Sequence, residues 1–339
     1  MVADAAVASL PAPLHTFFTH HRAAFLVHVE GDAGGGTAPA HGLPPDAHYL
    51  MLDVAASGDT PDGAAAAAVF PHDAAAARRV FRARAVRSGG SLPWVVRDRF
   101  GALARGFRSS EPETILREAG VITRLASAAA MPMNTTAWRD TGVGDGEHTL
   151  RHRYQVGLVD RLGARLGYEV RVHPSRYRGA SDPVEAVFSV MLKAHGDVAT
   201  VVAVDRKLIA ALELTDAEAF IAARDAYYDR FAAEAAGLLE SELENAALLA
   251  ADLIGGAWRE AGAPPLRVAD DASRAADRRA AAAAGGFVGS RHSGRFHVPT
   301  CPSAARIKPE NLVRFRTAVD AVAAGRTPCK TCHPQDTRP

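Results

Sequence analysis

All three cysteines of this chain lie within its last 39 residues, and two of them form a Cys-x2-Cys pair. Cys329 and Cys332 make up the pair, and His297 precedes Cys301 by four residues. An odd number of cysteines with this spacing is unusual for a disulfide framework and typical of a metal site. The 27 residues between the two pairs leave room for a small hairpin and a helix. The spacing therefore predicts that the C-terminal segment folds around a bound metal ion.

Thiolate and imidazole ligands in this pattern are those of structural zinc. Zn2+ prefers four such ligands in a closed tetrahedron, and closing the loop lets a short segment fold without a large apolar core. The predicted ligands are His297, Cys301, Cys329 and Cys332. His292 and His333 are nearby alternatives to His297, and three free cysteines beside unrelated histidines are the alternative to a site. We expect one structural Zn2+.

The same segment is basic, although the whole chain has a formal net charge of only +1. Residues 287–339 hold nine Lys or Arg and three acids, a net +6, so residues 1–286 carry 1 − 6 = −5. Basic side chains bind phosphates with an affinity that falls as salt rises. The candidate phosphate-binding residues are Arg291, Arg295, Lys308, Arg314, Arg316 and Lys330. The alternative is that a small surface domain carries solvated basic residues.

Three short motifs in this segment match one known family. They are Phe296-His297-x-Pro299-x-Cys301, the run at residues 306–311, and Pro328-Cys329-Lys330-x-Cys332. Together they resemble the Ada-type zinc domain. In the DNA-repair member of that family the first ligand is a cysteine that accepts a methyl group from a phosphotriester. His297 stands there in this chain, and imidazole cannot repeat chemistry that needs a zinc-activated thiolate. The resemblance therefore implies a non-repair copy that binds DNA or a partner.

The rest of the chain is predicted to be helical. Residues 214–260 repeat large apolar side chains at helical spacing after a capping-box pattern at Thr215 and Glu218, with a possible break near Gly237 or Gly255. Ser110 and Glu113 predict the start of a second helix, which ends before Pro132. Residues 264–285 hold almost no large apolar residue and are predicted to form a linker. The expected organisation is mainly α: a helical domain at 1–263, the linker, and a small α+β zinc module at 286–335.

Several segments of the helical domain match a second family. The segment 47–53, which contains His48, the run Leu92-Pro93-Trp94, and residues 119–136 are the main ones, and residues 245–264 match a last helix. They resemble the zinc-dependent phospholipase C and single-strand-specific nuclease superfamily. That resemblance implies an all-helical fold with a trinuclear zinc centre that cleaves phosphate esters.

The metal ligands of that superfamily are replaced in this chain. Its motif His-x3-Asp-x-His-x-Pro-x-His aligns through Pro132 with Arg124, Ala128, Ala130 and Asn134. The next ligand pair falls on Arg151 and Gln155, or on His152 and Val156 in a register shifted by one. Because each zinc ion of a hydrolase needs its own nitrogen and carboxylate ligands, the substitutions predict a degenerate, non-catalytic member.

An active enzyme remains the alternative. The residual candidates for a reduced zinc site are His48, Asp53, His148 and His152, with Asp32 as a loose carboxylate candidate. If residues 147–160 are helical, His148 and His152 share one face at metal-binding spacing. This hypothesis predicts a metal-dependent phosphodiesterase or nuclease with two or more zinc ions, whereas the degenerate protein holds one.

The N-terminus shows no basic region followed by an apolar run, and we find no window of about 18 uncharged apolar residues. The expectation is a cytoplasmic protein without a membrane span. An upstream start that restored a signal peptide would make it secreted or envelope-bound. The oligomeric state is not assigned.

Overall fold

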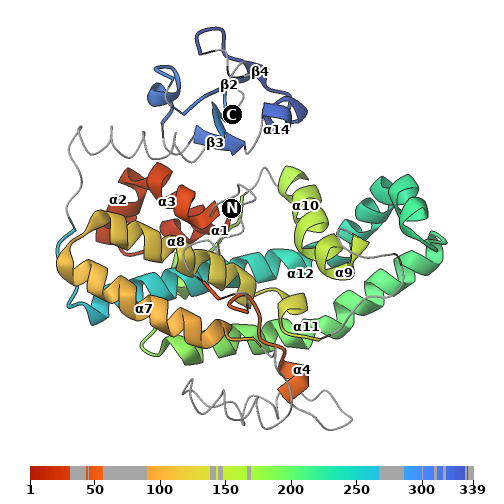
Figure 1. Ribbon diagram of the computed structural model, residues 1–339, viewed down its shortest axis with the longest axis horizontal. Coiled ribbons are helices and arrows are strands. Elements are labelled where there is room, and N and C mark those ends of the chain that lie inside the picture. Colours follow the sequence, from red (N-terminus) through yellow and green to blue (C-terminus); the bar gives the residue numbers. More distant parts are fainter. Residues whose placement is uncertain are drawn as a thin grey trace.

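The computed structural model describes residues 1–30, 43–44, 46–55, 90–137, 143, 148–165, 169–266, 286–299, 301–308, 311–315, 318–332 and 334. Most of these residues lie in helices, and a small mixed sheet lies near the C-terminus (Figure 1). The expected mainly α chain with a small C-terminal α+β part is confirmed at this level. Asp32, Arg316 and His333 lie outside the described residues.

Three short helices begin the chain: α1 (Val2–Ser9), α2 (Ala12–His20) and α3 (Arg22–Glu30). Pro11 and Pro13 flank the start of α2, where the fixed φ of proline suits a first helical turn. Phe17, Phe18 and Phe25 are almost completely buried, and their rings meet edge to face. These rings place α2 and α3 in the main core, which α1 joins through Ala3, Ala5 and Ala6.

Four longer helices form the frame of the body: α7 (Leu92–Ser109), α8 (Pro112–Ala129), α11 (Pro183–Ala211) and α12 (Ala217–Glu260). α8 lies in the centre and contacts α3, α7 and α12. Its buried residues include Ile115, Ala119, Ile122 and Leu125, which recur at helical spacing. The body therefore has one main apolar core around α8.

Both predicted capping boxes are wrong in detail. Ser110 lies after α7 in the left-handed region (φ 56°), and no side chain caps the start of α8. At α12 the cap is Asp216, whose carboxylate accepts a hydrogen bond from the Ala219 N–H at 2.9 Å. The 44-residue α12 also runs without a break through Gly237 and Gly255. When two residues that can cap a helix are adjacent in the sequence, the pattern alone does not show which of them is the N-cap.

A second apolar cluster joins the C-terminal half of α11 and the N-terminal half of α12 to the segment 148–165. This segment contains α9 (Leu150–His152), a π-helical turn (Arg153–Leu158) and α10 (Val159–Arg165). Arg153 is fully buried there, and its guanidinium contacts the Asp205 carboxylate at 2.8 Å. Tyr227 donates a hydrogen bond to the same carboxylate. A buried ion pair of this kind is tolerated because each charged group has its partner.

Three short elements complete the described body. They are α4 (Leu52–Ala55) and two 3₁₀ turns, Pro132–Asn134 and Pro174–Arg176. The N–H groups of Leu50 and Leu52 donate to the carbonyls of Asn134 and Thr135. The segment that precedes α4 therefore lies alongside the turn that follows α8.

Within the described part of the chain, α11 is the helix that is long and apolar enough to cross a membrane by length and composition alone. The 18-residue window that meets this test has a mean hydropathy of 1.5 and is 33% buried, and core helices of soluble proteins pass the same test. α11 contacts α7 and α12, with Val187, Phe188 and Met191 in the main core.

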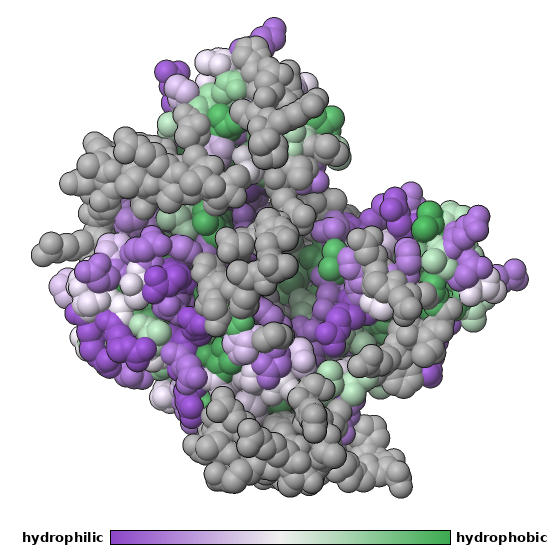
Figure 2. Space-filling view, in the orientation of Figure 1, coloured by the Kyte–Doolittle hydropathy of each residue, from purple (hydrophilic) through white to green (hydrophobic). Residues whose placement is uncertain are grey.

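On the face in Figure 2, hydrophilic side chains cover most of the outer surface near α7 and α8.

The C-terminal module is built on a four-stranded sheet. Its strands are β1 (Phe287–Ser290), β2 (Arg295–His297), β3 (Leu312–Phe315) and β4 (Thr327–Pro328), in the order β3-β1-β2-β4. β1 pairs antiparallel with β2 and β3, whereas β2 pairs parallel with β4. A 3₁₀ turn (Ala304–Arg306) and α14 (Ala318–Ala323) connect the strands.

The module contacts the helical body through two arginines. The guanidinium of Arg314, on β3, donates to the carbonyl of Ala23 at 3.0 Å, and Arg291 pairs with the Glu169 carboxylate at 2.8 Å. Burial lowers the pKa of Arg314, and the nearby Glu30 opposes that shift. The module consequently lies against the N-terminal helices (Figure 1).

Candidate metal centre

Four side chains of the C-terminal module come together at one end of its sheet. One ligand atom from each of His297, Cys301, Cys329 and Cys332 lies within 4.8 Å of the other three. His297, Cys301 and Cys329 are buried, and Cys332 is partly buried. Within the described ranges this is the one group of three or more His, Cys, Asp or Glu side chains close enough to share an ion.

Strand pairing brings the two halves of this cluster together. Phe296 pairs with Pro328 in the parallel β2–β4 ladder, and the Cys329 N–H extends it by donating to the Phe296 carbonyl at 3.0 Å. His297 and Cys329 directly follow these paired residues. Two ligands that are 32 residues apart in the sequence are therefore neighbours in space.

Tight turns place the remaining ligands. The Cys301 N–H donates to the Val298 carbonyl at 2.9 Å, so the chain turns back directly after β2. Gly325 (φ 72°) ends α14, and the Arg326 N–H donates to the Ala321 carbonyl at 2.9 Å. This is the glycine-terminated helix end that satisfies the last carbonyls, and it directs the chain into β4.

The protonation of the thiols depends on their neighbours. Burial raises the pKa of Cys329, but hydrogen bonds from Thr331 and Cys332 outweigh it and lower that pKa to about 6. One of them runs from the Thr331 N–H to Cys329 Sγ at 3.4 Å. Burial and the adjacent Cys301 raise the pKa of Cys332 to about 12. Because a cation would favour every thiolate in the cluster, metal binding and loss of the thiol protons are coupled.

The donor set fits a zinc ion. His297 Nδ1 is buried and has no hydrogen-bond partner in the described part of the chain, so its polar atom lacks compensation without an ion. Three sulfur donors and one nitrogen donor form the Cys3His set of closed structural zinc sites. A Zn2+ held by these four residues would stabilise the fold and keep no open position for a substrate.

The predicted phosphate-binding residues do not all face solvent. Arg314 is partly buried against the body, and Arg291, although exposed, is paired with Glu169 of the body. Arg295, Lys308 and Lys330 are exposed on the module. The basic surface that remains for a ligand in the described residues is therefore smaller than the sequence suggests.

Asp53 and His48, two residual candidates in the body, have different surroundings. Asp53 accepts hydrogen bonds from the Thr136 hydroxyl at 2.5 Å and from the Ala137 N–H at 2.9 Å. Burial and the positive charge of Arg124 lower the pKa of His48. Asp53 thus holds the chain after α8, and His48 lies beside a cation.

Among the described residues, the other two candidates belong to no group of three or more potential metal ligands. His148 stacks edge to face on Phe220, with ring centroids 5.7 Å apart, and its carbonyl accepts from the Arg153 guanidinium. His148 precedes α9, and His152 is its last residue. The helix α9 therefore begins after His148, so His148 and His152 do not share a helical face as predicted.

Several positions that the resemblance pairs with superfamily ligands are buried or hydrogen-bonded within the protein. The side-chain amide of Asn134 donates to the Ala128 carbonyl at 3.0 Å, and Ala130 is buried. Arg151 donates to the Met133 carbonyl at 2.7 Å. Hydrogen bonds within the protein therefore occupy Asn134 and Arg151.

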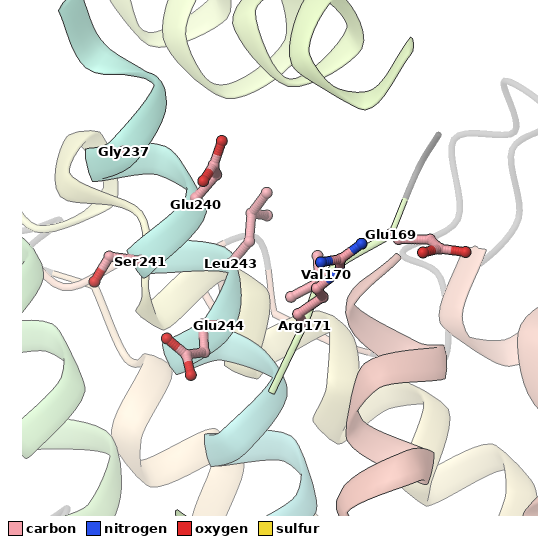
Figure 3. A pocket seen from close by; sticks show the side chains of 8 residues that line it. All are labelled: Glu169, Val170, Arg171, Gly237, Glu240, Ser241, Leu243 and Glu244. Carbon is pink, nitrogen blue, oxygen red and sulfur yellow. The ribbon is translucent and has the colours of Figure 1, made fainter. Parts of the chain in front are cut away.

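Two cavities formed by described residues of the body share Leu243. The first, of about 500 Å³, lies between α12 and the segment 169–171 (Figure 3). Figure 3 shows Glu240 and Glu244 on the α12 wall and Glu169 on the opposite wall. Ion pairs with Arg291 and Arg176 hold Glu169 and Glu244, so much of the acidic charge here is compensated.

The second cavity, of about 300 Å³, lies between Met1 and Val2 at the start of the chain, the C-terminal end of α8, the π-helical turn and α12. Ala128 and Gln155 both line it, together with Met131, Val159 and Leu243. Nothing in the sequence pattern signalled this cavity, because its walls come from segments that are far apart in the chain. The resemblance to the phospholipase C and nuclease superfamily places a metal ligand at Ala128 and, in one of its two registers, at Gln155.

A family model described as the metal binding domain of Ada matches residues 271–335. The match contains all four clustered side chains, so the tail is an Ada-like zinc-binding module that fits one structural Zn2+. No curated protein matches the chain.

Proposed function

We propose that this chain is a non-catalytic protein, in which a helical body of phospholipase C and nuclease ancestry carries a structural zinc module that binds nucleic acid. The observation that carries the proposal is the cavity lined by Ala128 and Gln155. These two residues are 27 positions apart. The resemblance aligns Ala128 with a metal ligand of that superfamily, and it aligns Gln155 with another in one of its two registers, the other register giving Val156.

The lining of the cavity supports a loss of metal chemistry. Its side chains are Met, Val, Ser, Ala, Gln and Leu, none of which ionises. A zinc hydrolase must hold two or three cations with imidazole and carboxylate groups, generate hydroxide and stabilise the leaving oxygen. An alanine and an amide at these positions can do none of this.

A contact beside the turn after α8 also supports the shared ancestry. The segment 47–53, which resembles the superfamily's segment that delivers a zinc histidine, is hydrogen-bonded to that turn through Leu50 and Leu52. Burial lowers the pKa of His48, and the nearby Arg124 guanidinium lowers it further. A fixed positive charge at this point disfavours a metal cation and favours an anion or a neutral group.

The alternative, an active phosphodiesterase with a reduced site, needs His48, Asp53, His148 and His152 to act together. Asp53 is committed to Thr136 and Ala137, and His148 packs on Phe220. These contacts favour the non-catalytic protein.

Zinc content and hydrolysis test the non-catalytic proposal together. We expect one zinc ion per chain by elemental analysis, and no hydrolysis of bis(p-nitrophenyl) phosphate above buffer, with or without added Zn2+. Two or more tightly bound ions, together with turnover that is lost in His48→Ala, would establish the alternative enzyme.

Nucleic-acid binding is proposed for the exposed basic residues of the module. Arg295, Lys308 and Lys330 are exposed, and the module is net positive whereas the rest of the chain is net negative. Contacts of this kind release counterions, so affinity falls steeply with salt.

Fluorescence anisotropy with a labelled DNA duplex tests this binding. We expect Lys308→Ala with Lys330→Ala to weaken binding several-fold and to reduce the slope against salt by about two ions. Lys193→Ala with Lys207→Ala, on the exposed side of α11, is the matched control and should leave binding unchanged. Equal losses in both pairs, or binding that does not respond to salt, would contradict a role for the module.

A further inference from the structure

The basic side chains of the zinc module fall into two groups along its sheet, whose strand order is β3-β1-β2-β4. Arg314 lies on β3 and Arg291 directly follows β1, and both contact the body (Figure 1). Arg295 on β2 and Lys330 beyond β4 belong to the other half of the sheet and are exposed. The body therefore covers one part of the basic surface and leaves the other part exposed.

The contact of Arg314 with the body satisfies its guanidinium only in part. One nitrogen donates to the Ala23 carbonyl, near the start of α3, at 3.0 Å. The Nε atom is buried and has no hydrogen-bond partner among the described residues. Burial lowers the pKa of Arg314, and the opposing attraction of Glu30 does not restore it. A buried cation with an unmade hydrogen bond costs free energy, so the docked position is an unfavourable one for this side chain.

The other contacts between module and body add little to the docking. Arg291 pairs with Glu169 at 2.8 Å, but the two side chains are 33% and 53% exposed. Exposed pairs contribute only about 0.2–1 kcal/mol. Burial raises the pKa of Asp160 on α10, and the nearby Asp320 on α14 of the module raises it further. Because two acids that face each other repel, this contact opposes docking.

The phosphate backbone of a nucleic acid offers these arginines better partners than the body does. The body gives Arg314 a neutral carbonyl oxygen. A phosphate accepts two parallel, charge-assisted hydrogen bonds from one guanidinium. Residues 287–339 carry a net +6 and residues 1–286 a net −5, so the body itself is an anionic partner of the module. The body and a nucleic acid are therefore competitors for the same arginines.

We propose that Arg291 and Arg314 form a second phosphate-binding surface of the module, which the body covers, and that a DNA duplex displaces the module from the body. Docking is then an inhibitory contact, because the docked chain offers DNA fewer cations. This inference rests on the proposed nucleic-acid binding of the module. DNA shifts the docking equilibrium only by its preference for the undocked state, and the two additional arginine contacts supply that preference.

A substitution on the body weakens docking and leaves the module unchanged. Glu169→Gln removes the partner of Arg291, so it should increase affinity for a labelled DNA duplex by about two- to five-fold in fluorescence anisotropy. Glu240→Gln removes the same charge from the opposite wall of the first cavity (Figure 3) and is the matched control, which should leave affinity unchanged.

A further substitution asks whether Arg291 contacts DNA once it is released. In the Glu169→Gln chain the ion pair is already lost, so Arg291→Ala no longer affects docking through it. Its addition should weaken DNA binding several-fold and reduce the slope against salt by about one ion. Unchanged binding and slope would show that Arg291 belongs to no phosphate-binding surface.

Hydrogen exchange on the full zinc-loaded chain reports the displacement itself. A saturating amount of duplex should increase exchange at α3, which carries the Ala23 carbonyl, and leave the buried centre of α12 unchanged as an internal control. Glu169→Gln should increase exchange at α3 without DNA, and Glu240→Gln should not.

Equal affinities of Glu169→Gln and Glu240→Gln, or an α3 that stays protected when DNA is bound, would overturn the inference. Nucleic-acid binding by the module would still stand in that case if Lys308→Ala with Lys330→Ala weakens it. A complete lack of DNA binding in every variant, with zinc bound and circular dichroism spectra unchanged, would overturn both proposals. Binding that appears only in Glu169→Gln would support both.

Discussion

The zinc module and the helical body reach a folded state by different routes. The described core cluster of the module consists of Val288, Ala304 and two of the four clustered cysteines. The body instead buries two large clusters of Leu, Phe, Val and Ala side chains. Hydrophobic burial therefore suffices for the body, whereas the module depends on its metal ligands. A chain can thus join two stability mechanisms that respond to different perturbations.

The largest expected effect is that of removing two zinc ligands. Cys329→Ser with Cys332→Ser should abolish zinc binding, because serine hydroxyls do not replace thiolates. The loss is on the order of 10 kcal/mol of binding free energy, which is also folding free energy for the module. Elemental analysis should show no zinc, and limited proteolysis should cut the module while the helical signal of the body persists.

The matched control is Lys330→Ser, which places the same residue between the two cysteines at an exposed position. It should keep one zinc per chain and an uncut module. A double variant that retained its zinc would show that the ligands are assigned incorrectly.

A substitution that removes a large side chain from the core of the body should destabilise the body and leave zinc binding unchanged. Phe18 is fully buried against Phe17 and Phe25, so Phe18→Ala should cost about 3–5 kcal/mol of unfolding free energy. Urea denaturation followed by circular dichroism measures this loss, and Phe18→Leu should cost less than about 1.5 kcal/mol. Zinc released from Phe18→Ala under native conditions would show that body and module are not independent.

The pH dependence of the body has a specific source in Glu242. Burial raises its pKa from 4.5 to about 9, against the opposing hydrogen bond from Tyr154. Between these values the folded chain holds a proton that the unfolded chain releases, so this group's contribution to stability is complete below about pH 4.5 and falls as pH rises toward 9.

Replacing the carboxyl by a neutral amide should remove that dependence. As pH rises across this window, the unfolding free energy of the unaltered chain should fall relative to that of Glu242→Gln. The difference between the two should grow by up to about 1.4 kcal/mol per pH unit. Urea denaturation at pH 5, 6, 7 and 8 measures the difference. Glu240→Gln, on the exposed side of the same helix, should show none, and a constant difference in Glu242→Gln would contradict the shifted pKa.

The smallest expected effect concerns the contact between the two regions. Arg314→Ala removes the hydrogen bond to the Ala23 carbonyl and should weaken the docking of the module by about 1–3 kcal/mol. Hydrogen exchange at α3 should increase while zinc stays bound. Arg306→Ala, an exposed arginine of the module, is the control, and an unchanged α3 in Arg314→Ala would show that this contact does not hold the module.

The parts of the molecule that were predictable from the sequence are those encoded locally. The cysteine and histidine spacing marked the zinc cluster, and helical periodicity marked α12, which runs to Glu260 as expected. Both signals lie within short windows, where spacing translates directly into geometry.

The parts that were missed join distant segments. Arg153 and Asp205 are 52 residues apart, and Arg314 contacts a carbonyl 291 residues away. In the sequence, a buried arginine looks like an exposed one until its partner is known. The cavity at Gln155 likewise needs several elements to be packed together, so no single window contains it.

Hydrogen exchange with and without a zinc chelator tests the central difference most directly, because it reports both regions of one chain at once. Chelation should remove protection from β1, β2 and β4 in the module and leave α8 and α12 in the body unchanged. Loss of protection in both regions, or in neither, would contradict a zinc-dependent module on a metal-independent body.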